Sequence, residues 1–222
     1  MAGLPRYFEA SIAVFILLIA SPASLLAALL IRLTSPGPIL FCQARVGQSG
    51  RTFNLYKLRT MSLSAEGLQI TASHDARVTW IGRILRKTKI DELPELWNVL
   101  KGDLSLVGPR PEVPRYVNLE NPQWKRVLQA KPGITDPVTL KLRNEEMLLA
   151  GIKGDREEYY LKVLQPYKLH GYVDYLNKRG LWTDIKILLQ TSIAIMLPRT
   201  APLPSSAEIE KVVRMSEDAV KK

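Results

Sequence analysis

Two adjacent carboxylates, Asp91 and Glu92, stand in the densest cluster of polar candidates in this sequence. Several Lys and Arg residues precede them, and Arg110 follows in a turn between two prolines. Neighbouring positive charges favour ionised carboxylates. Carboxylate oxygens together with phosphate oxygens are suitable ligands for Mg²⁺. The cluster therefore indicates chemistry on a phosphorylated substrate, with Asp91 and Glu92 as candidate ligands of a magnesium ion.

A short helix has to position these carboxylates. Pro94 is tolerated only in the first turn of a helix, so the spacing predicts a helix over residues 92–100 with Asp91 as its N-cap and Gly102 at its end. A helix N-terminus attracts anions. The same pattern also has a purely structural interpretation, in which Asp91 only caps the helix and Glu92 is a solvated acid of its first turn.

Other elements are predicted around this helix. Residues 39–41 and 51–59 are expected to form a β-hairpin that carries Lys57 and Arg59 at its end. Apolar periodicity predicts helices over 78–87 and 155–177. Residues 104–107 form a short apolar strand, and the spacing of Ser205 and Glu208 predicts a capping box before a final helix. The segment 181–197 is too short to span a bilayer, and is either a buried helix or a helix lying in the membrane interface.

The N-terminal segment is apolar enough to meet lipid. Residues 10–31 contain no charged side chain, and about 20 apolar residues in a helix cross the hydrocarbon core. Ser21 and Pro22 lie near its middle, where the proline leaves the carbonyl of Leu18 without its helical hydrogen bond. The hydroxyls of Ser21 and Ser24 are candidates to satisfy that carbonyl. The pattern fits a kinked spanning helix or a helix that breaks at Ser21-Pro22 and returns to the same face.

Composition narrows the chemistry further. The chain has 222 residues and a formal net charge of +10, which suggests an anionic partner such as nucleic acid, acidic lipid or a phosphorylated substrate. One cysteine excludes an intramolecular disulfide, and two histidines far apart in sequence argue against a zinc site or a histidine-dependent triad. Carboxylates, lysines and arginines are left to carry any catalysis.

The stretch 91–111 resembles the signature of the bacterial sugar transferases, the monotopic phosphoglycosyl transferases, nearly throughout. Two further blocks are similar to that family, and the likeness covers at least residues 8–136. The chain departs from it at Lys89, where a small polar residue is expected, and at Asp136-Pro137, where many members have glycine. The matching positions outside 91–111 are Phe41, Gln43, Arg45, Gly47, Gly50, Phe53, 57–61 and 131–135.

The resemblance implies an α/β fold, mostly helical with a short β-hairpin. It implies a compact domain on the cytoplasmic face of the bacterial inner membrane, held by a re-entrant helix broken at Ser21-Pro22 and by interfacial amphipathic helices. The expected divisions are a membrane helix over 1–34, a catalytic domain over 35–198 and a tail helix over 199–222. At this length the chain looks like the short, monotopic form of the family.

The resemblance also implies a reaction. Asp91 would attack the β-phosphate of a UDP-sugar, UMP would leave, and polyprenyl phosphate would take the sugar phosphate from the aspartyl intermediate. Glu92 would orient Asp91, bind Mg²⁺ or accept a proton. The implied partners are a UDP-sugar, polyprenyl phosphate and anionic membrane lipids, with no nucleic acid and a possible homodimer. The candidate phosphate-binding or site residues are Arg110, Lys57, Arg59, Arg86 and Asp103.

Several alternatives stay open on the sequence. Arg86 is also explained as a surface charge near anionic lipid, and Asp103 as a turn residue after Gly102. A glycosyl transferase that moves the sugar alone would release UDP instead of UMP. A basic membrane scaffold without catalytic activity would keep its function when Asp91 is replaced by Asn.

Overall fold

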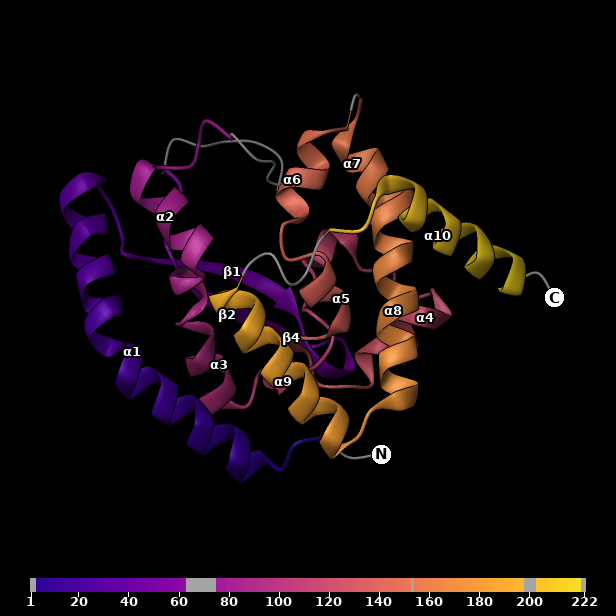
Figure 1. Cartoon of the computed structure of the whole chain (residues 1–222), viewed down its shortest axis with the longest axis horizontal. Coiled ribbons are helices and arrows are strands. Elements are labelled where there is room, and N and C mark those ends of the chain that lie inside the picture. Colours follow the sequence, from indigo (N-terminus) through magenta and orange to yellow (C-terminus); the bar gives the residue numbers. More distant parts are fainter. Residues whose placement is uncertain (1–2, 63–74, 153, 198–202, 221–222) are drawn as a thin grey trace.

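The protein is mostly helical, and its strands form two small sheets among the residues described. The computed structural model describes residues 3–62, 75–152, 154–197 and 203–220. These elements confirm the expected mixture of many helices and a short hairpin (Figure 1). The strands are β1 (Leu40–Val46), β2 (Thr52–Leu58), β3 (Ser105–Val107) and β4 (Gly133–Thr135). The helices are α1 (Arg6–Thr34), α2 (Trp80–Thr88), α3 (Glu95–Lys101), α4 (Pro122–Leu128), α5 (Pro137–Lys141), α6 (Glu145–Ala150), α7 (Arg156–Tyr159), α8 (Gln165–Lys178), α9 (Leu181–Met196) and α10 (Ser206–Val220).

The predicted hairpin is present, with a first strand longer than expected. Strands β1 and β2 pair antiparallel from Leu40 opposite Leu58 to Val46 opposite Thr52. The connecting turn contains Gly50 at φ +76°, a backbone conformation that favours glycine. Lys57 therefore lies at the end of the hairpin that is remote from this turn.

A second sheet joins two segments that are distant in sequence. Strands β3 and β4 pair in parallel, with Ser105 opposite Gly133 and Val107 opposite Thr135. A Cβ atom on Gly133 would lie 2.1 Å from the backbone nitrogen of Gly108, so only glycine permits this approach. The sheet brings the turn that follows β3 beside residues 131–135.

Helix α1 is bent near its middle, and Figure 1 shows its two arms running in different directions. Pro22 lies inside the helix, and the Ser21 Oγ donates a hydrogen bond of 2.8 Å to the carbonyl of Leu18. This contact confirms the expectation for Ser21. Among the described residues, α1 is the one helix long and apolar enough to cross a membrane, and most of its length is exposed.

The first turns of α1 dock on the rest of the chain. Arg6 donates a 2.8 Å hydrogen bond to the carbonyl of Leu100 at the end of α3. Glu9 and Ala13 are buried, and the carboxylate of Glu9 reaches β3. The more distal arm of α1 packs through Ala27 and Ile31 against a cluster that includes α2.

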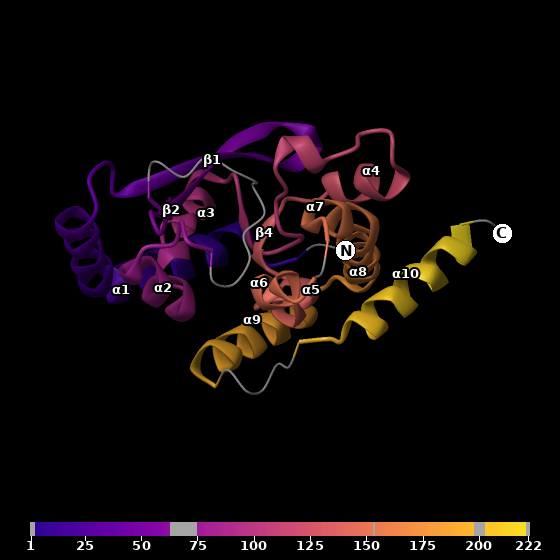
Figure 2. The same ribbon diagram turned by 90° about the horizontal axis from the view of Figure 1, so that it is seen from above.

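Helices α7 and α8 are joined by a π-helical turn over residues 160–164, so that 156–178 forms one helical stretch. This stretch packs with α4 and α10 around the largest apolar core. The capping box before α10 is confirmed, since Ser205 N donates to Glu208 Oε2 at 2.7 Å and Glu208 N to Ser205 Oγ at 3.3 Å. Figure 2 shows α10 extending from the end of the molecule opposite α1.

Helix α9 has two unlike faces. Asp184, Ile187 and Ala194 are buried against the domain. The other face is open to solvent and mostly apolar, with Trp182 and Met196 each 80% exposed and with Lys186 and Gln190 also exposed. A fully buried helix is therefore wrong for this segment, while its placement in a membrane interface stays a prediction.

Candidate active site

The carboxylate pair lies in a tight turn before α3. Lys89 ends α2 in the left-handed conformation, with φ 59°, and a 3₁₀ turn follows over residues 90–92. Helix α3 begins only at Glu95, with Pro94 at its N-cap position. The expectation that Asp91 caps the helix is wrong, because the 3₁₀ turn separates Asp91 from the first turn of α3. Its carboxylate is therefore free of a capping role.

Asp91 is a buried acid with one oxygen left without a partner. Its side chain belongs to a residue that is 6% exposed, and no described residue donates a hydrogen bond to Oδ1. Burial, followed by the neighbouring charge of Glu92, raises the pKa of Asp91 to about 6. Desolvation therefore outweighs the nearby cations in setting the pKa of Asp91, although a carboxyl with this pKa is still mostly ionised at neutral pH.

Glu92 has the opposite electrostatic environment. Its Oε1 lies 2.9 Å from Lys57 Nζ and 2.6 Å from Arg110 Nη2. Burial disfavours the ionised form, but the positive charges of Arg110, Lys57 and Lys89 outweigh it and hold the pKa of Glu92 well below its usual range. Glu92 is therefore an ionised anchor for two cations.

Glu95 is a third carboxylate in this cluster, and it was not among the residues predicted for the site. It is 1% exposed, and its Oε1 lies 3.1 Å from Lys57 Nζ and 3.9 Å from Arg110 Nη2. The sequence contained a usable signal, because residues three apart on a helix share a face and Glu95 follows Glu92 by three. Lys57 and Arg110 thus lie between two acids.

Arg110 comes to the site from the turn after β3. Its Nη1 donates a 3.2 Å hydrogen bond to the carbonyl of Ile134 in β4, while Nη2 binds Glu92. The paired acids raise the pKa of Arg110 despite its burial. Parallel pairing of β3 with β4 therefore sets the direction of this guanidinium.

The other predicted site residues are more dispersed. Arg86 is at the edge of the site, where Nε donates to Thr60 Oγ1 at 2.9 Å and Nη1 pairs with Glu146 at 2.6 Å. Its charge also acts on Asp91 and opposes the rise in the pKa of that acid. Arg86 is thus close enough to contribute to the field at Asp91.

Arg59 and Asp103 make contacts away from the carboxylate pair. Arg59 is buried and donates to the carbonyls of Ser35 and Pro36 at 2.7 and 2.5 Å, just beyond α1. Asp103 accepts from Asn98 Nδ2 at 3.1 Å, at the opposite end of α3 from Asp91. The structure brings together Asp91, Glu92, Lys57 and Arg110, and it places Arg59 at the junction with α1.

The donor set fits Mg²⁺ only in part. Among the described residues, no group of three or more His, Cys, Asp or Glu side chains is arranged to hold a metal. Mg²⁺ usually keeps several waters and takes one or two protein carboxylates together with substrate phosphates. The unpartnered Oδ1 of Asp91 and the adjacent carboxylate of Glu92 meet that smaller requirement.

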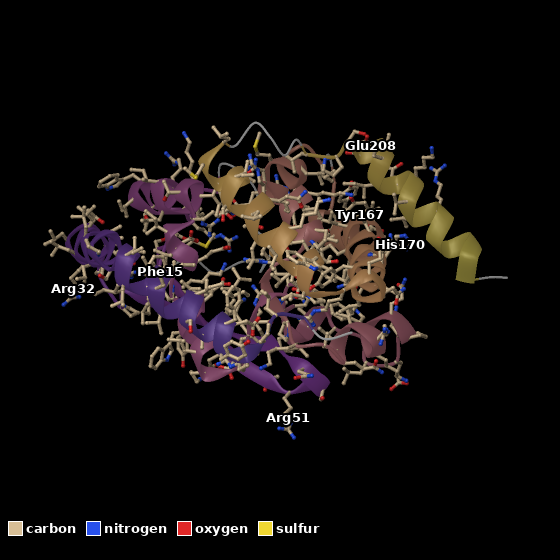
Figure 3. The ribbon with its side chains drawn as sticks, turned by 60° about the horizontal axis from the view of Figure 1, so that its bottom comes forward. Phe15, Arg32, Arg51, Tyr167, His170 and Glu208 are labelled. Carbon is tan, nitrogen blue, oxygen red and sulfur yellow. The ribbon has the colours of Figure 1, made fainter. Side chains whose placement is uncertain are left out.

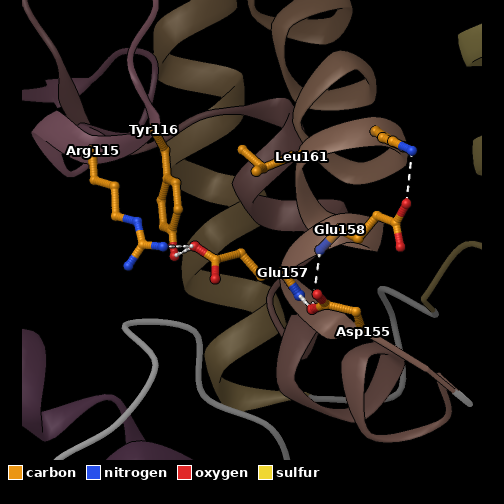
Figure 4. Close-up of a pocket in the computed structure, with 7 residues that line it drawn as sticks. Arg115, Tyr116, Asp155, Glu157, Glu158 and Leu161 are labelled. Carbon is orange, nitrogen blue, oxygen red and sulfur yellow. Dashed lines mark hydrogen bonds and ion pairs between the residues drawn. The ribbon is translucent and has the colours of Figure 1, made fainter.

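A surface pocket of about 410 Å³ lies elsewhere, between α7 and the turn that contains Tyr116 (Figure 4). In it Glu157 accepts from the Tyr116 hydroxyl at 3.0 Å and pairs with Arg115 at 2.8 Å. None of the residues predicted for the site lines this pocket, so we place the candidate chemistry at Asp91. The lining residues are Arg115, Tyr116, Asp155, Glu157, Glu158, Leu161 and Lys162.

The chain combines an apolar N-terminal helix with a carboxylate pair beside Lys57 and Arg110, an arrangement that suits chemistry on phosphorylated substrates. The model of the bacterial sugar transferase family matches residues 2–198. The chain belongs to the bacterial sugar transferase family.

Three relatives show the range of this similarity. The UDP-glucose:undecaprenyl-phosphate glucose-1-phosphate transferase of Caulobacter vibrioides is 42% identical over 77% of this chain and 61% of its own length. The UDP-N-acetylgalactosamine-undecaprenyl-phosphate N-acetylgalactosaminephosphotransferase of Aeromonas hydrophila is 35% identical over 88% and 44%. The undecaprenyl-phosphate glucose phosphotransferase of Komagataeibacter xylinus is 36% identical over 84% and 34%. The chain thus matches between about a third and three fifths of the length of these relatives.

Proposed function

We propose that this protein transfers a sugar 1-phosphate from a UDP-sugar to polyprenyl (undecaprenyl) phosphate, giving polyprenyl-diphosphate-sugar and UMP. Membership of the family and the names of its relatives support the reaction class. The observation that carries the proposal is the buried carboxylate of Asp91, whose Oδ1 lacks a hydrogen bond beside two cations held by Glu92. An unpartnered carboxylate oxygen is available to act as a nucleophile.

In the first step an Asp91 oxygen forms a bond to the β-phosphorus of the donor, and the bond from that phosphorus to the bridging oxygen breaks. UMP leaves with the electron pair, and the sugar phosphate remains on Asp91 as a mixed anhydride. Lys57 and Arg110, which lie beside Glu92, would bind phosphate oxygens of the donor. In the second step an acceptor phosphate oxygen attacks the same phosphorus, and Asp91 is released as a carboxylate.

Glu92 and Glu95 would hold Lys57 and Arg110 in place while no substrate is bound. We include Mg²⁺ in the proposal, held by Asp91 and Glu92 and by donor phosphates. When bound, the ion would neutralise diphosphate charge and stabilise the leaving nucleotide. Arg86 adds positive potential at the edge of the site.

We extend the proposal to the membrane. The N-terminal segment 1–34, with α1 as a re-entrant helix, would enter the cytoplasmic leaflet of the inner membrane and turn at Ser21-Pro22. The catalytic domain of 35–198 and the tail of 199–222 would lie on the cytoplasmic face. The bend, the exposed apolar side chains of α9, the exposure of Phe15 and the position of Arg32 at the edge of the molecule in Figure 3 support this arrangement. Basic side chains beside these surfaces would meet anionic lipids. Homodimerisation and the absence of nucleic-acid binding stay predictions.

Nucleotide release tests the reaction. Detergent-solubilised protein is incubated with Mg²⁺, polyprenyl phosphate and a panel of UDP-sugars, and the nucleotide product is identified. Release of UMP that requires the lipid for turnover supports the proposal and identifies the sugar. Release of UDP would instead place the protein among transferases that move the sugar alone.

Cysteine labelling tests the membrane arrangement. In a Cys42→Ser background, Tyr7→Cys and Leu33→Cys place single thiols at exposed positions near the two ends of α1. A membrane-impermeant reagent should label both thiols from the cytoplasmic side of inverted vesicles. Labelling of the two from opposite sides would show that α1 spans the bilayer.

A further inference from the structure

Glu9 is a buried acid on the otherwise largely exposed helix α1. It is 3% exposed, whereas neighbours on the same helix such as Phe8 and Tyr7 are open to solvent. Asp and Glu are rarely fully buried unless they are paired or hydrogen-bonded. The burial of Glu9 therefore indicates a specific set of contacts, which the proposed reaction does not use.

Those contacts lie on the free edge of β3. The backbone N–H of Leu106 donates a 2.9 Å hydrogen bond to Glu9 Oε1, and the Ser105 hydroxyl donates to the same oxygen. Strand β3 pairs with β4 through Ser105 and Val107, so the N–H of Leu106 points to the other edge. Glu9 supplies the acceptor that a third strand would otherwise provide.

A second contact links the same arm of α1 to α3. Arg6, one turn before Glu9, donates to the carbonyl of Leu100, where a cation also complements the negative end of the helix. The two contacts hold the segment that starts with Asp91 and leads to Arg110. The membrane helix is thus attached to the backbone that carries the candidate site.

We propose that Glu9 is a positioning residue that clamps the first arm of α1 to β3 and thereby fixes the height of the Asp91–Arg110 site above the lipid surface. The kinetic part of this inference rests on the proposed function. A soluble donor reaches the site from water at any height. The phosphate of a lipid acceptor stays at headgroup level, so the second half-reaction alone depends on the height of the site.

Two assays separate these half-reactions. Incorporation of labelled UMP into UDP-sugar without acceptor reports the first, and lipid-dependent transfer in vesicles containing polyprenyl phosphate reports both. In Glu9→Ala, loss of the buried acceptor should lower transfer by about tenfold while UMP exchange changes less than about twofold. Glu9→Gln should restore most of the transfer, because its amide oxygen can accept from the N–H of Leu106.

Ser11→Ala is the matched control, since Ser11 is exposed and, within the described part of the chain, its hydroxyl bonds only to the carbonyl of Tyr7 in its own helix. It should leave both assays unchanged. A parallel fall of exchange and transfer in Glu9→Ala would show a purely structural role and overturn the proposal. Unchanged transfer in that variant would overturn it as well.

A distance measurement tests the clamp without reference to activity. Spin labels at Phe15→Cys and Lys101→Cys, in a Cys42→Ser background, report the position of α1 relative to α3. The distance distribution should be narrow in the otherwise native protein and broader in Glu9→Ala. An unchanged distribution would overturn the clamp. Absence of UMP exchange in the native protein would instead contradict the proposed function, and the labels would still decide the role of Glu9.

Discussion

Two buried aspartates differ sharply in how their oxygens are satisfied. Asp136 caps α5, where Oδ1 accepts from Val138 N at 2.7 Å and Thr139 N at 3.1 Å, and Oδ2 accepts from the Thr139 hydroxyl. Asp91 lies in the 3₁₀ turn before α3, and no described residue donates to its Oδ1. Burial raises the pKa of both acids. Burial alone therefore does not distinguish the two aspartates, whereas the unpartnered oxygen does, and that oxygen is the reason for proposing Asp91 as the nucleophile.

Replacing Asp91, the proposed nucleophile, should have the largest effect. Asp91→Asn keeps the shape of the side chain but removes the anionic nucleophile, so UMP release should fall by on the order of 10³-fold or more. The melting temperature should stay close to that of the native protein. UMP release and thermal unfolding measured on one preparation check both expectations, and undiminished release would exclude Asp91 as the nucleophile.

Arg110→Lys should have the next largest effect. The lysine keeps the charge but loses the planar fork that binds both Ile134 and Glu92, so kcat/KM for the donor should fall by about 10- to 100-fold. The substitution should lower kcat/KM for the donor and change the free energy of unfolding only slightly. An unchanged kcat/KM would show that Arg110 only balances the charge of Glu92.

Asp136→Ala should have the opposite effect to Asp91→Asn, lowering stability and leaving activity largely intact. Loss of an N-cap lowers the free energy of unfolding by about 1–2 kcal/mol. The specific activity of the folded fraction should change far less than in Asp91→Asn, because the hydrogen bonds of Asp136 go to α5 and its influence on Arg110 is through charge alone. Chemical denaturation together with UMP release measures both quantities. An activity loss comparable to that of Asp91→Asn would remove the distinction between the two aspartates.

Asp136→Asn should have the smallest effect, with a definite pH dependence. Asn is as good an N-cap as Asp. The folded pKa of Asp136 is raised, so ionisation destabilises the folded state once the pH exceeds the ordinary pKa of about 3.9. Asn avoids that penalty, and the stability of the variant relative to the native protein should be higher at pH 7 than at pH 4. Melting curves at both pH values measure this difference, and a difference of opposite sign would contradict it.

The local parts of the site could be predicted from the sequence. The position of Pro94 indicates that a helix starts close to it. Pro22 indicates a bend in the first helix, and Ser21 is a predicted hydrogen-bond donor to the carbonyl of Leu18. Lys57, Arg110 and Glu92 were expected near one another, and the structure brings their charged groups into contact.

The remaining parts depend on pairings between distant segments. Strands β3 and β4 pair in parallel although α4 and its flanking loops separate them in sequence. No local sequence pattern predicts this pairing. The burial of Glu95 and the capture of Arg59 by the carbonyls of Ser35 and Pro36 follow from tertiary packing. Asp91 lost its predicted capping role because Lys89 adopts the left-handed conformation and a 3₁₀ turn intervenes.

In the π-helical turn between α7 and α8, the number of residues matters as much as their identity. A π-turn holds about one residue more than an α-turn, which changes the rotational phase of the helix by about 100°. This offset lets the Tyr160 hydroxyl reach Glu112 while Leu164 and Tyr172 stay in the core. Deletion of a single residue from 160–164 would make the helix regular. Either the Tyr160 hydroxyl would then lose Glu112, or Leu164 and Tyr172 would rotate out of the core.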